Sequence, residues 1–372
     1  MAEPLKNYYG REIAAQVASM IEPVYPGFDS DRFIAECLDG YEELELTARA
    51  RHISGSLAGH LPADFEEAAG ILHASLGPPI EGDELMGQGM GSFVYLPYVF
   101  YVAEHGVAHW DTAMAFQHEL TQRFSCEYSI RAFIEKETDR TMGRLRVWTG
   151  DPNAHVRRLV SEGTRPRLPW APRLRMFVDD PGPVVDLLER LKDDPSTMVR
   201  RSVANNLNDI GKDNPRVLTE VCRAWIRDAG PERDAMVRHA LRSAVKRGDP
   251  EALDILGYGS SEGAIIESVM IEPPEVEIGQ RVQVSFGLVN DLATPASYNV
   301  DLVVHFVKAS GSTSPKVFKV RSVELGPGEG TRLSKTISVA QHTTRTHYPG
   351  EHRLDLVVNG SPRTAGSFLL VT

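Results

Sequence analysis

The chain has 372 residues, which is too long for one compact core and predicts two or more domains. Hydrophobic residues make up 42% of it, as in ordinary globular proteins, and no apolar run approaches the roughly 18 residues of a membrane-spanning helix. The formal net charge of -11, taken over the whole chain, argues against a nucleic-acid partner.

Positive charge is nevertheless concentrated in the middle third of the chain. Residues 140–247 contain 22 Lys and Arg against 14 Asp and Glu, a net charge of +8, whereas residues 1–139 carry -15. Arginine supplies 19 of those 22 cations, and its planar guanidinium can bind two phosphate oxygens at once. The middle third is thus a basic island of the kind that binds phosphate.

The compartment is indicated by the first residues and the cysteines. Residues 1–25 lack a basic segment followed by an apolar one, so no signal peptide is predicted. Cys37, Cys126 and Cys222 are far apart and in no metal-ligand spacing, which favours buried thiols in a reducing bacterial cytoplasm. His105 and His109 are four residues apart, but no third ligand stands near them, so no metal site and no cofactor are predicted.

Two fold types follow each other along the chain. Residues 1–258 show apolar residues at helical spacing between Pro, Gly and Asp breakers, which predicts helices. From residue 264 to residue 372 apolar residues alternate in short Val- and Thr-rich runs, which predicts about seven strands in an immunoglobulin-like sandwich. The fold class is therefore mainly α, a helical-repeat solenoid followed by a small all-β domain, with a linker over residues 257–263.

The helical region contains an internal repeat. Asp151-Pro152, followed by Val156-Arg157-Arg158, recurs 43 residues later as Asp194-Pro195, followed by Val199-Arg200-Arg201; a degenerate third copy begins at Val237-Arg238. A period near 40 residues is typical of HEAT-like helix pairs. We expect each Asp-Pro to open the second helix of a pair, with Asp as the N-cap and Pro at the first helical position.

The repeat predicts which helix faces are buried and which face a groove. Val199, Val203, Leu207 and Ile210 share one face and are expected to pack inside the solenoid. Arg201, Asn205, Asn208 and Lys212 share another face, with Asp209 at its edge, and the preceding copy places Arg158 and Glu162 on the equivalent face. We interpret Arg157 and Arg200 as structural links between repeats, and Arg158 and Arg201 as DNA contacts.

Glu162, Asp209, Trp170 and Arg158 together suit one kind of chemistry. Cleavage of the bond between deoxyribose and a cationic base builds positive charge on the sugar, which a carboxylate and an aromatic ring stabilise. Each residue also has a structural interpretation: Glu162 as the i+4 partner of Arg158, Asp209 as a cap, and Trp170 as packing between repeats. The combination in a basic region favours a site.

A long motif carries a family resemblance. The run from Trp148 to Trp170, W-x-x-D-x-N-x-x-V-R-R-L-x-S-E-G-x-R-P-R-L-P-W, resembles the DNA alkylation repair glycosylases built from HEAT-like repeats. Residues 199–215 and 241–258 fit the same family, and the motif HYPGEHRLDLVVNG resembles the immunoglobulin-like appendage of its AlkC branch. The resemblance is weakest over residues 1–95.

The resemblance implies an enzyme that excises N3-methyladenine, 3-methylcytosine and 1-methyladenine from duplex DNA without flipping the base and without a metal. No lysine is evidently placed as a Schiff-base nucleophile, so a monofunctional enzyme is predicted. Carried onto this chain, it assigns catalytic roles to Glu162 and Trp170, then to Asp209 and Glu127. It implies that Arg158 and Arg165 contact phosphate or sugar.

Further DNA contacts are predicted on less specific grounds. Arg201 and Asn205 lie on the expected groove face, Trp148 is a second aromatic candidate, and Lys246 ends the basic island. Arg345 lies in the loop from Gln341 to Gly350, which is placed to reach a DNA groove.

The predicted partner is damaged double-stranded DNA, bound by a monomer with no membrane contact. Two alternatives stay open at this point: a HEAT-repeat protein that binds unusual DNA without cutting it, and a protein-interaction scaffold. The set of three carboxylates favours catalysis, and the basic island disfavours the scaffold.

Overall fold

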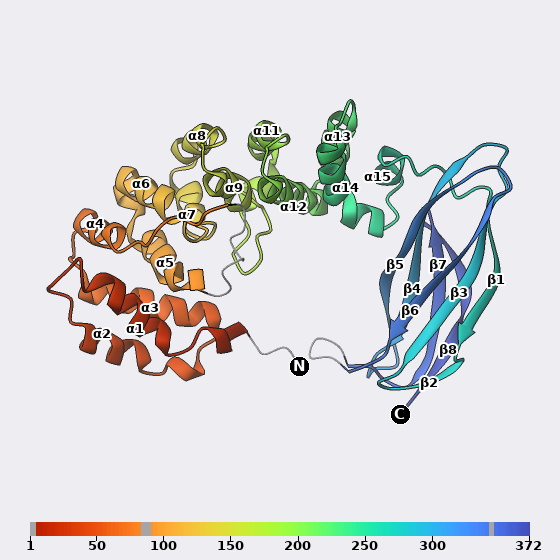
Figure 1. The fold of residues 1–372 in the computed structure, drawn as a ribbon, viewed down its shortest axis with the longest axis horizontal. Helices are drawn as coiled ribbons and strands as arrows, with labels where there is room; N and C mark the ends of the chain where they lie inside the picture. Colours follow the sequence, from red (N-terminus) through yellow and green to blue (C-terminus); the bar gives the residue numbers. More distant parts are fainter. Residues whose placement is uncertain (1–4, 83–90, 342–345) are drawn as a thin grey trace. The chain divides into compact units, whose positions relative to one another are not determined.

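A computed structural model describes residues 5–82, 91–341 and 346–372. In these residues fifteen α-helices precede eight β-strands (Figure 1). The helices are α1 (Glu12–Ile21), α2 (Ser30–Leu38), α3 (Leu46–His60), α4 (Phe65–Ala74), α5 (Leu96–His105), α6 (Trp110–Leu120), α7 (Ser129–Lys136), α8 (Thr138–Trp148), α9 (Ala154–Gly163), α10 (Arg175–Asp179), α11 (Gly182–Leu191), α12 (Thr197–Asp213), α13 (Pro215–Ile226), α14 (Pro231–Lys246) and α15 (Pro250–Ile255).

Helices of the repeat region form two rows. Figure 1 shows α4, α6, α8 and α11 in one row and α5, α7, α9 and α12 in the other, which lies on the inside of the arc that these helices make. Helix α9 contacts α8, α11 and α12, as expected for stacked helix pairs. The predicted core face is confirmed, because the side chains of Val199, Val203, Leu207 and Ile210 are all fully buried.

The predicted role of the two Asp-Pro pairs as helix starts is wrong. Helix α9 has Asn153 as its N-cap and α12 has Ser196, so each helix begins three residues after its aspartate. Each aspartate instead folds the turn before the cap: Asp151 Oδ1 accepts from Asn153 N at 2.8 Å, and Asp194 Oδ1 accepts from Ser196 N at 2.9 Å. Asp and Asn side chains favour such local bonds to the backbone, and here the aspartate makes the turn while the next polar residue caps the helix.

These aspartates also join neighbouring repeats. Arg157 donates to both carboxylate oxygens of Asp194, at 2.6 and 2.9 Å. His118 Nε2 lies 2.8 Å from Asp151 Oδ2 in the same manner one repeat earlier. Arg200 donates to the carbonyls of Asp194 and Pro195. Arg157 thus links two repeats, as predicted, whereas these bonds of Arg200 go to the turn that precedes its own helix.

The β domain is a sandwich of two sheets. Strands β1 (Ala264–Glu272), β3 (Arg281–Asn290) and β6 (Gly330–Ser338) form one sheet in the order β1-β3-β6. The other has the order β2-β8-β7-β4-β5, built from β2 (Glu275–Glu277), β4 (Ala296–Val307), β5 (Thr313–Leu325), β7 (Gly350–Val358) and β8 (Ser361–Val371). Val282, Val284, Phe286 and Leu288 alternate along β3 and are fully buried, which is the period-2 pattern of a strand with one face in the core.

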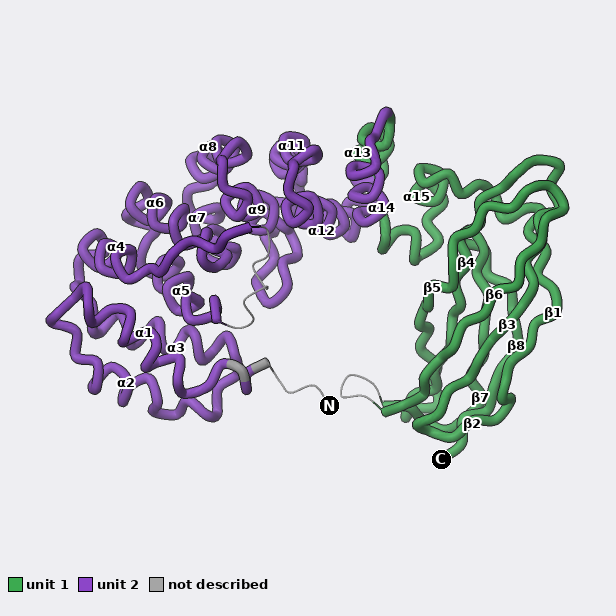
Figure 2. The backbone as a smooth tube through the Cα atoms, viewed as in Figure 1, with its two compact units in different colours: residues 1, 219–227, 241–372 green, residues 2–218, 228–240 purple. Residues whose placement is uncertain are grey.

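Contacts between residues divide the chain into two compact units (Figure 2). One comprises residues 2–218 and 228–240, and the other residues 219–227 and 241–372 together with residue 1. The end of α14 and helix α15 therefore group with the sandwich. The turn between α14 and α15 comes close to the turn between β7 and β8. This approach depends on glycine, because a Cβ on Gly248 would lie 2.9 Å from the Cα of Gly360.

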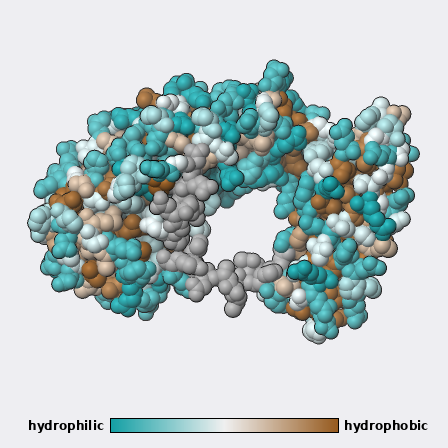
Figure 3. All heavy atoms as spheres, viewed as in Figure 1, coloured by the Kyte–Doolittle hydropathy of each residue, from teal (hydrophilic) through white to brown (hydrophobic). Residues whose placement is uncertain are grey.

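The surface of the outer helices is predominantly polar on the face shown in Figure 3. In Figure 3 hydrophilic side chains cover most of the visible surface over α8 and α11, with hydrophobic residues scattered singly. The exposed large hydrophobic residues of the described chain are Val24, Val147, Trp170, Ile265, Met270 and Leu369. Among the described residues no helix combines the length and the apolar character that crossing a membrane requires.

Candidate active site

Six charged side chains of alternating sign form a continuous row that joins helices α9 and α12 to the segments before α7 and after α9. The row runs Glu127, Arg158, Glu162, Arg165, Asp209 and Lys212, and each member forms an ion pair with the next. Glu127 precedes α7, Arg158 and Glu162 belong to α9, Arg165 follows α9, and Asp209 and Lys212 belong to α12. We call these six residues the charged row. It unites all the predicted catalytic carboxylates and both arginines that the resemblance implicates.

Glu162 lies in the last turn of α9 and is only 5% exposed. Its Oε1 accepts from Arg165 Nη1 at 2.5 Å, its Oε2 accepts from Ser202 Oγ at 2.6 Å, and Arg158 Nη2 is 3.8 Å away. Burial alone raises the pKa of a carboxyl group, but Arg158, Arg165 and the Ser202 hydroxyl together hold the pKa of Glu162 below its ordinary 4.5. Glu162 is therefore a carboxylate at neutral pH despite its burial.

Asp209 is the most deeply buried carboxylate of the charged row, at 1% exposure. Arg165 donates to its Oδ2 from both Nε and Nη2 at 2.7 Å, and Lys212 Nζ donates to its Oδ1 at 2.6 Å. One guanidinium thus bridges Glu162 and Asp209. Such charge-assisted bonds are strong and restrict the orientation of both partners. Arg165 therefore sets the separation of the Glu162 and Asp209 carboxylates.

Glu127 stands at the end of the charged row opposite Lys212. Its Oε2 accepts from Ser125 Oγ at 2.7 Å and from Arg158 Nη1 at 3.1 Å. Arg158 Nη1 also donates to Ser125 Oγ at 2.9 Å. The Glu127 side chain is 16% exposed, against 7% for Glu162, so Glu127 is the more accessible of these two carboxylates.

Trp170 presents its indole outside the protein core, with 65% exposure. Its backbone φ is 62°, in the left-handed region that costs a non-glycine residue about 1–2 kcal/mol. It occupies the third position of a turn closed by the bond from Ala171 N to Leu168 O at 3.3 Å. Glycine or asparagine is usual at such a position, so a bulky aromatic residue there indicates a functional constraint.

A cavity of about 170 Å³ lies beside this indole. Trp170, Glu127 and Arg158 line it, but Glu162 and Asp209 do not. The remaining lining side chains are mostly apolar or aromatic: Leu46, Thr47, Ser92, Phe93, Leu96, Phe124, Ser125 and Tyr128. The end of the charged row therefore opens into an aromatic cavity, and helix α3 from the acidic N-terminal region supplies part of its wall.

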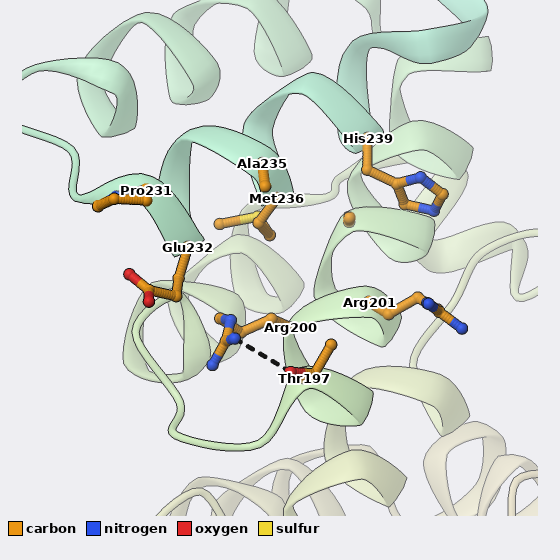
Figure 4. Close-up of a pocket in the computed structure, with 9 residues that line it drawn as sticks. Thr197, Arg200, Arg201, Pro231, Glu232, Ala235, Met236 and His239 are labelled. Carbon is orange, nitrogen blue, oxygen red and sulfur yellow. Dashed lines mark hydrogen bonds between the residues drawn. The ribbon is translucent and has the colours of Figure 1, made fainter.

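A second hollow, of about 460 Å³, lies between α12 and α14 and carries positive charge (Figure 4). Arg200, Arg201 and His239 line it together with Glu232. Arg201 and His239 occupy the position that Arg158 has in the first copy of the repeat. Arg158 is paired with two carboxylates, whereas exposed Arg201 forms no ion pair with any described residue. Asn205 bonds to His239 at 3.1 Å beside this hollow.

Two of the predicted DNA contacts lie apart from these groups. Trp148 is 5% exposed and packs against the His118 ring, so its indole belongs to the helix packing. Lys246 is exposed at the end of α14 and lies in the compact unit of the sandwich. Arg345 lies outside the described residues.

Several site residues escaped the sequence analysis. Ser202 shares a helix face with Asp209, seven residues later, and that spacing was the available signal. Ser125, Phe93 and Tyr128 reach the site only through the tertiary fold. In the described residues no group of three His, Cys, Asp or Glu side chains is arranged to hold a metal, and each carboxylate of the charged row faces a cation.

Comparisons with known proteins place the chain in a family. A family model described as the C-terminal Ig-like domain of the uncharacterised protein YhaZ matches residues 265–372. The uncharacterised protein YhaZ of Bacillus subtilis is 33% identical over 365 residues, which are 98% of each chain. The solved structure of the Pseudomonas fluorescens alkylpurine DNA glycosylase AlkC, bound to DNA containing an abasic site analog, matches all of both chains with 34% identity and a TM-score of 0.91. The chain therefore belongs to the AlkC branch of the HEAT-like-repeat DNA glycosylase superfamily, the branch with a C-terminal immunoglobulin-like domain.

Proposed function

We propose that this protein is a DNA glycosylase that excises cationic alkylated bases from duplex DNA by hydrolysis of the N-glycosidic bond. The observation that carries the proposal is the charged row, which keeps the buried Glu162 carboxylate ionised and ends at a cavity lined by the exposed, strained Trp170. The whole-chain similarity to the alkylpurine glycosylase of Pseudomonas fluorescens supports the same reaction.

The chemistry needs little from the protein beyond fixed charge. A methylated cationic base leaves as a neutral molecule when the electron pair of the bond to C1′ of deoxyribose moves onto its ring nitrogen. The sugar then carries oxocarbenium character, which a carboxylate and the face of Trp170 stabilise. A water oxygen bonds to C1′, and its proton passes to a carboxylate and on to solvent.

Geometry suggests different tasks for the carboxylates. Glu127 lines the cavity beside Trp170, so it is the carboxylate best placed to reach the sugar from that side. Glu162 and Asp209 lie behind it, bridged by Arg165, and are proposed to supply negative potential and to hold the row in position. The three carboxylates and Trp170 are thus proposed to serve the reaction, as the sequence motif suggests.

Substrates are proposed to be N3-methyladenine, 3-methylcytosine and 1-methyladenine, excised without flipping the base. A lesion that stays stacked needs only one edge of its sugar to reach the charged row.

DNA is proposed to lie along the inner row of helices, with its backbone near the hollow between α12 and α14. Arg201 is the best candidate for a phosphate contact there, since it is exposed and has no carboxylate partner among the described residues. Asn205 and His239 stand beside it. Arg158 and Arg165 are proposed to serve the site through their carboxylate partners and to contact the sugar or the adjoining phosphate.

The test is to incubate the pure protein with a duplex that contains one 3-methylcytosine, and separately with methylated genomic DNA, and to measure released base. We expect release by the wild type and large losses for Glu162→Gln and Trp170→Ala with DNA binding retained. Strand breakage in the absence of added base would contradict a monofunctional enzyme. No release on any lesion, with salt-sensitive DNA binding intact, would indicate a DNA-structure-binding protein instead.

A further inference from the structure

The segment from Thr164 to Leu174 joins α9 to α10 and carries both Arg165 and Trp170. It has no helix or strand of its own, and its first residues, 164–166, are buried. Leu168 and Leu174 are buried, and Arg167 pairs with Asp213 of α12 through both carboxylate oxygens. We call residues 164–174 the tryptophan loop.

One buried guanidinium from a neighbouring helix holds both ends of the tryptophan loop. Arg131, on α7, is 5% exposed. Its Nη1 donates to the carbonyl oxygens of Gly163 at 3.1 Å and Arg165 at 2.7 Å, and its Nη2 donates to the carbonyl of Pro172 at 2.5 Å. Arg165 and Pro172 lie on opposite sides of Trp170 in the sequence, so a single side chain joins the two stretches of the loop that flank Trp170.

The chemistry of arginine suits this task. Its planar fork offers five N–H donors in fixed directions, whereas lysine offers a compact point charge on a flexible stem. Burial lowers the pKa of Arg131 to about 10, which leaves the group charged at neutral pH. Its three acceptors are backbone carbonyls, so the contact restrains the main chain of the loop directly.

Trp170 needs such a restraint. Its φ of 62° is unfavourable for any residue with a Cβ, and its exposed indole has little packing to hold it. Strained backbone persists only where the surrounding contacts over-determine it. Arg131 supplies those contacts to the tryptophan loop. The same loop carries Arg165, which bridges Glu162 and Asp209.

We propose that Arg131 is a positioning residue: it clamps the tryptophan loop and thereby sets both the indole of Trp170 and the guanidinium of Arg165 in the geometry that base excision requires. Arg131 lines no part of the cavity, and its hydrogen bonds in the described residues all go to main-chain carbonyls, so it acts on the loop through the main chain. Its charge also interacts with those of Glu127 and Arg165 at longer range, and Arg131→Lys keeps that charge. The proposal rests on the proposed glycosylase function for its kinetic consequence, but the restraint of Trp170 can be measured without activity.

The test uses Arg131→Met and Arg131→Lys with Arg49→Met as a matched control. Arg49 is also 5% exposed and also clamps backbone carbonyls, including those of Leu44 and Tyr9, none of which lines the cavity. Both Met variants leave buried carbonyls without a donor, and both are expected to lower Tm. Measurements are made on the full chain at a temperature below both transitions.

Two readouts separate positioning from general stability. The single-turnover rate of base release at saturating DNA is expected to fall between about tenfold and a hundredfold in Arg131→Met, with the Kd for DNA within about twofold of wild type, because small misplacements of catalytic groups slow the chemical step. Arg49→Met is expected to keep the wild-type rate within about twofold. Arg131→Lys should lie between Arg131→Met and wild type.

Acrylamide quenching supplies the readout that needs no activity. Trp110, Trp148 and Trp225 are at most 5% exposed, so quenching reports the exposed Trp170. The quenching constant should rise towards that of the denatured chain in Arg131→Met and stay unchanged in Arg49→Met. Equal rates and equal quenching in the two Met variants would overturn the proposal. If the wild type released no base, the proposed function would fail, while the quenching comparison would still decide whether Arg131 restrains Trp170.

Discussion

Replacement of Glu162 by glutamine removes one negative charge from the middle of the charged row while keeping the size of the side chain. Arg165, Ser202 and Arg158 surround the carboxylate at 2.5, 2.6 and 3.8 Å. The amide oxygen of glutamine can still accept from Arg165, and its NH₂ group can donate to Ser202. What disappears is the charge that two arginines face.

The size of the stability loss follows from these contacts. Breaking a buried ion pair by removing one partner costs about 3–5 kcal/mol when the remaining charge is uncompensated. Here Arg165 keeps Asp209 and Arg158 keeps Glu127, so we expect about 2–3 kcal/mol. For a unit of this size that corresponds to a fall in Tm of about 5–10 °C. The rate of base release is expected to fall by about 10²–10³, the usual effect of removing one preorganised electrostatic group.

Asp194→Asn provides the matched control for this assay. Asp194 is 6% exposed and receives two bonds from Arg157, so its substitution removes a comparable buried pair away from the site. Single-turnover base release from a duplex with one alkylated base is measured beside thermal unfolding for both variants. A similar fall in Tm is expected for both, with a large fall in rate for Glu162→Gln alone.

The pH dependence gives an independent check. Because the folded pKa of Glu162 lies below its ordinary 4.5, its ionisation stabilises the folded state fully above about pH 4.5, and that contribution is lost as the pH falls through the lower folded pKa. The difference in unfolding free energy between wild type and Glu162→Gln should therefore be constant near neutral pH and shrink in acid. A rate within about threefold of wild type for Glu162→Gln, with DNA binding intact, would refute the assignment of this carboxylate to catalysis.

Three further substitutions test separate parts of the structure. Trp170→Gly relieves a φ of 62°, so it should leave Tm unchanged or raise it by a few degrees while the rate of base release falls. Thermal unfolding and a base-release assay check both, and a clear drop in Tm would show that the indole packs against the protein. Arg201→Gln should lower the slope of the logarithm of the DNA-binding constant against the logarithm of the salt concentration by about one, without lowering Tm. Arg200→Gln, which loses bonds to two carbonyls, should lower Tm instead. DNA binding titrated at several salt concentrations checks the pair, and equal slopes for wild type and Arg201→Gln would remove Arg201 from the interface. Gly163→Ala should destabilise the protein by about 1–3 kcal/mol in denaturant unfolding, because its Cβ would lie 2.4 Å from Ile130 Cγ2, and a neutral result would mean that α7 and α9 can move apart.

Much of the fold could be read from local pattern. The period of 43 residues indicated stacked helix pairs, and the spacing of Val199, Val203 and Leu207 identified the buried face of α12. Alternating apolar residues predicted the sandwich that begins at β1. These signals are local, because a helix repeats every 3.6 residues and a strand every two, so the sequence records which face of each element is buried.

Pairing across the repeats was not contained in that pattern. Spacing along α9 showed that Arg158 and Glu162 are neighbours, but not that Glu127, 31 residues earlier, shares the same guanidinium. The Asp-Pro aspartates resembled helix caps by composition, and only the packed structure gave Asp194 its second task as the partner of Arg157.

The sequence by itself determined the helical repeats, the sandwich, the basic island and the residue types of the site, since all of these depend on composition and on spacing within single elements. Only the tertiary structure decided the order of the charged row, the left-handed backbone at Trp170 and the clamp from Arg131. Those features join residues from different helices and loops. Their geometry depends on the stacking of α7, α9 and α12, which no periodicity within one helix encodes.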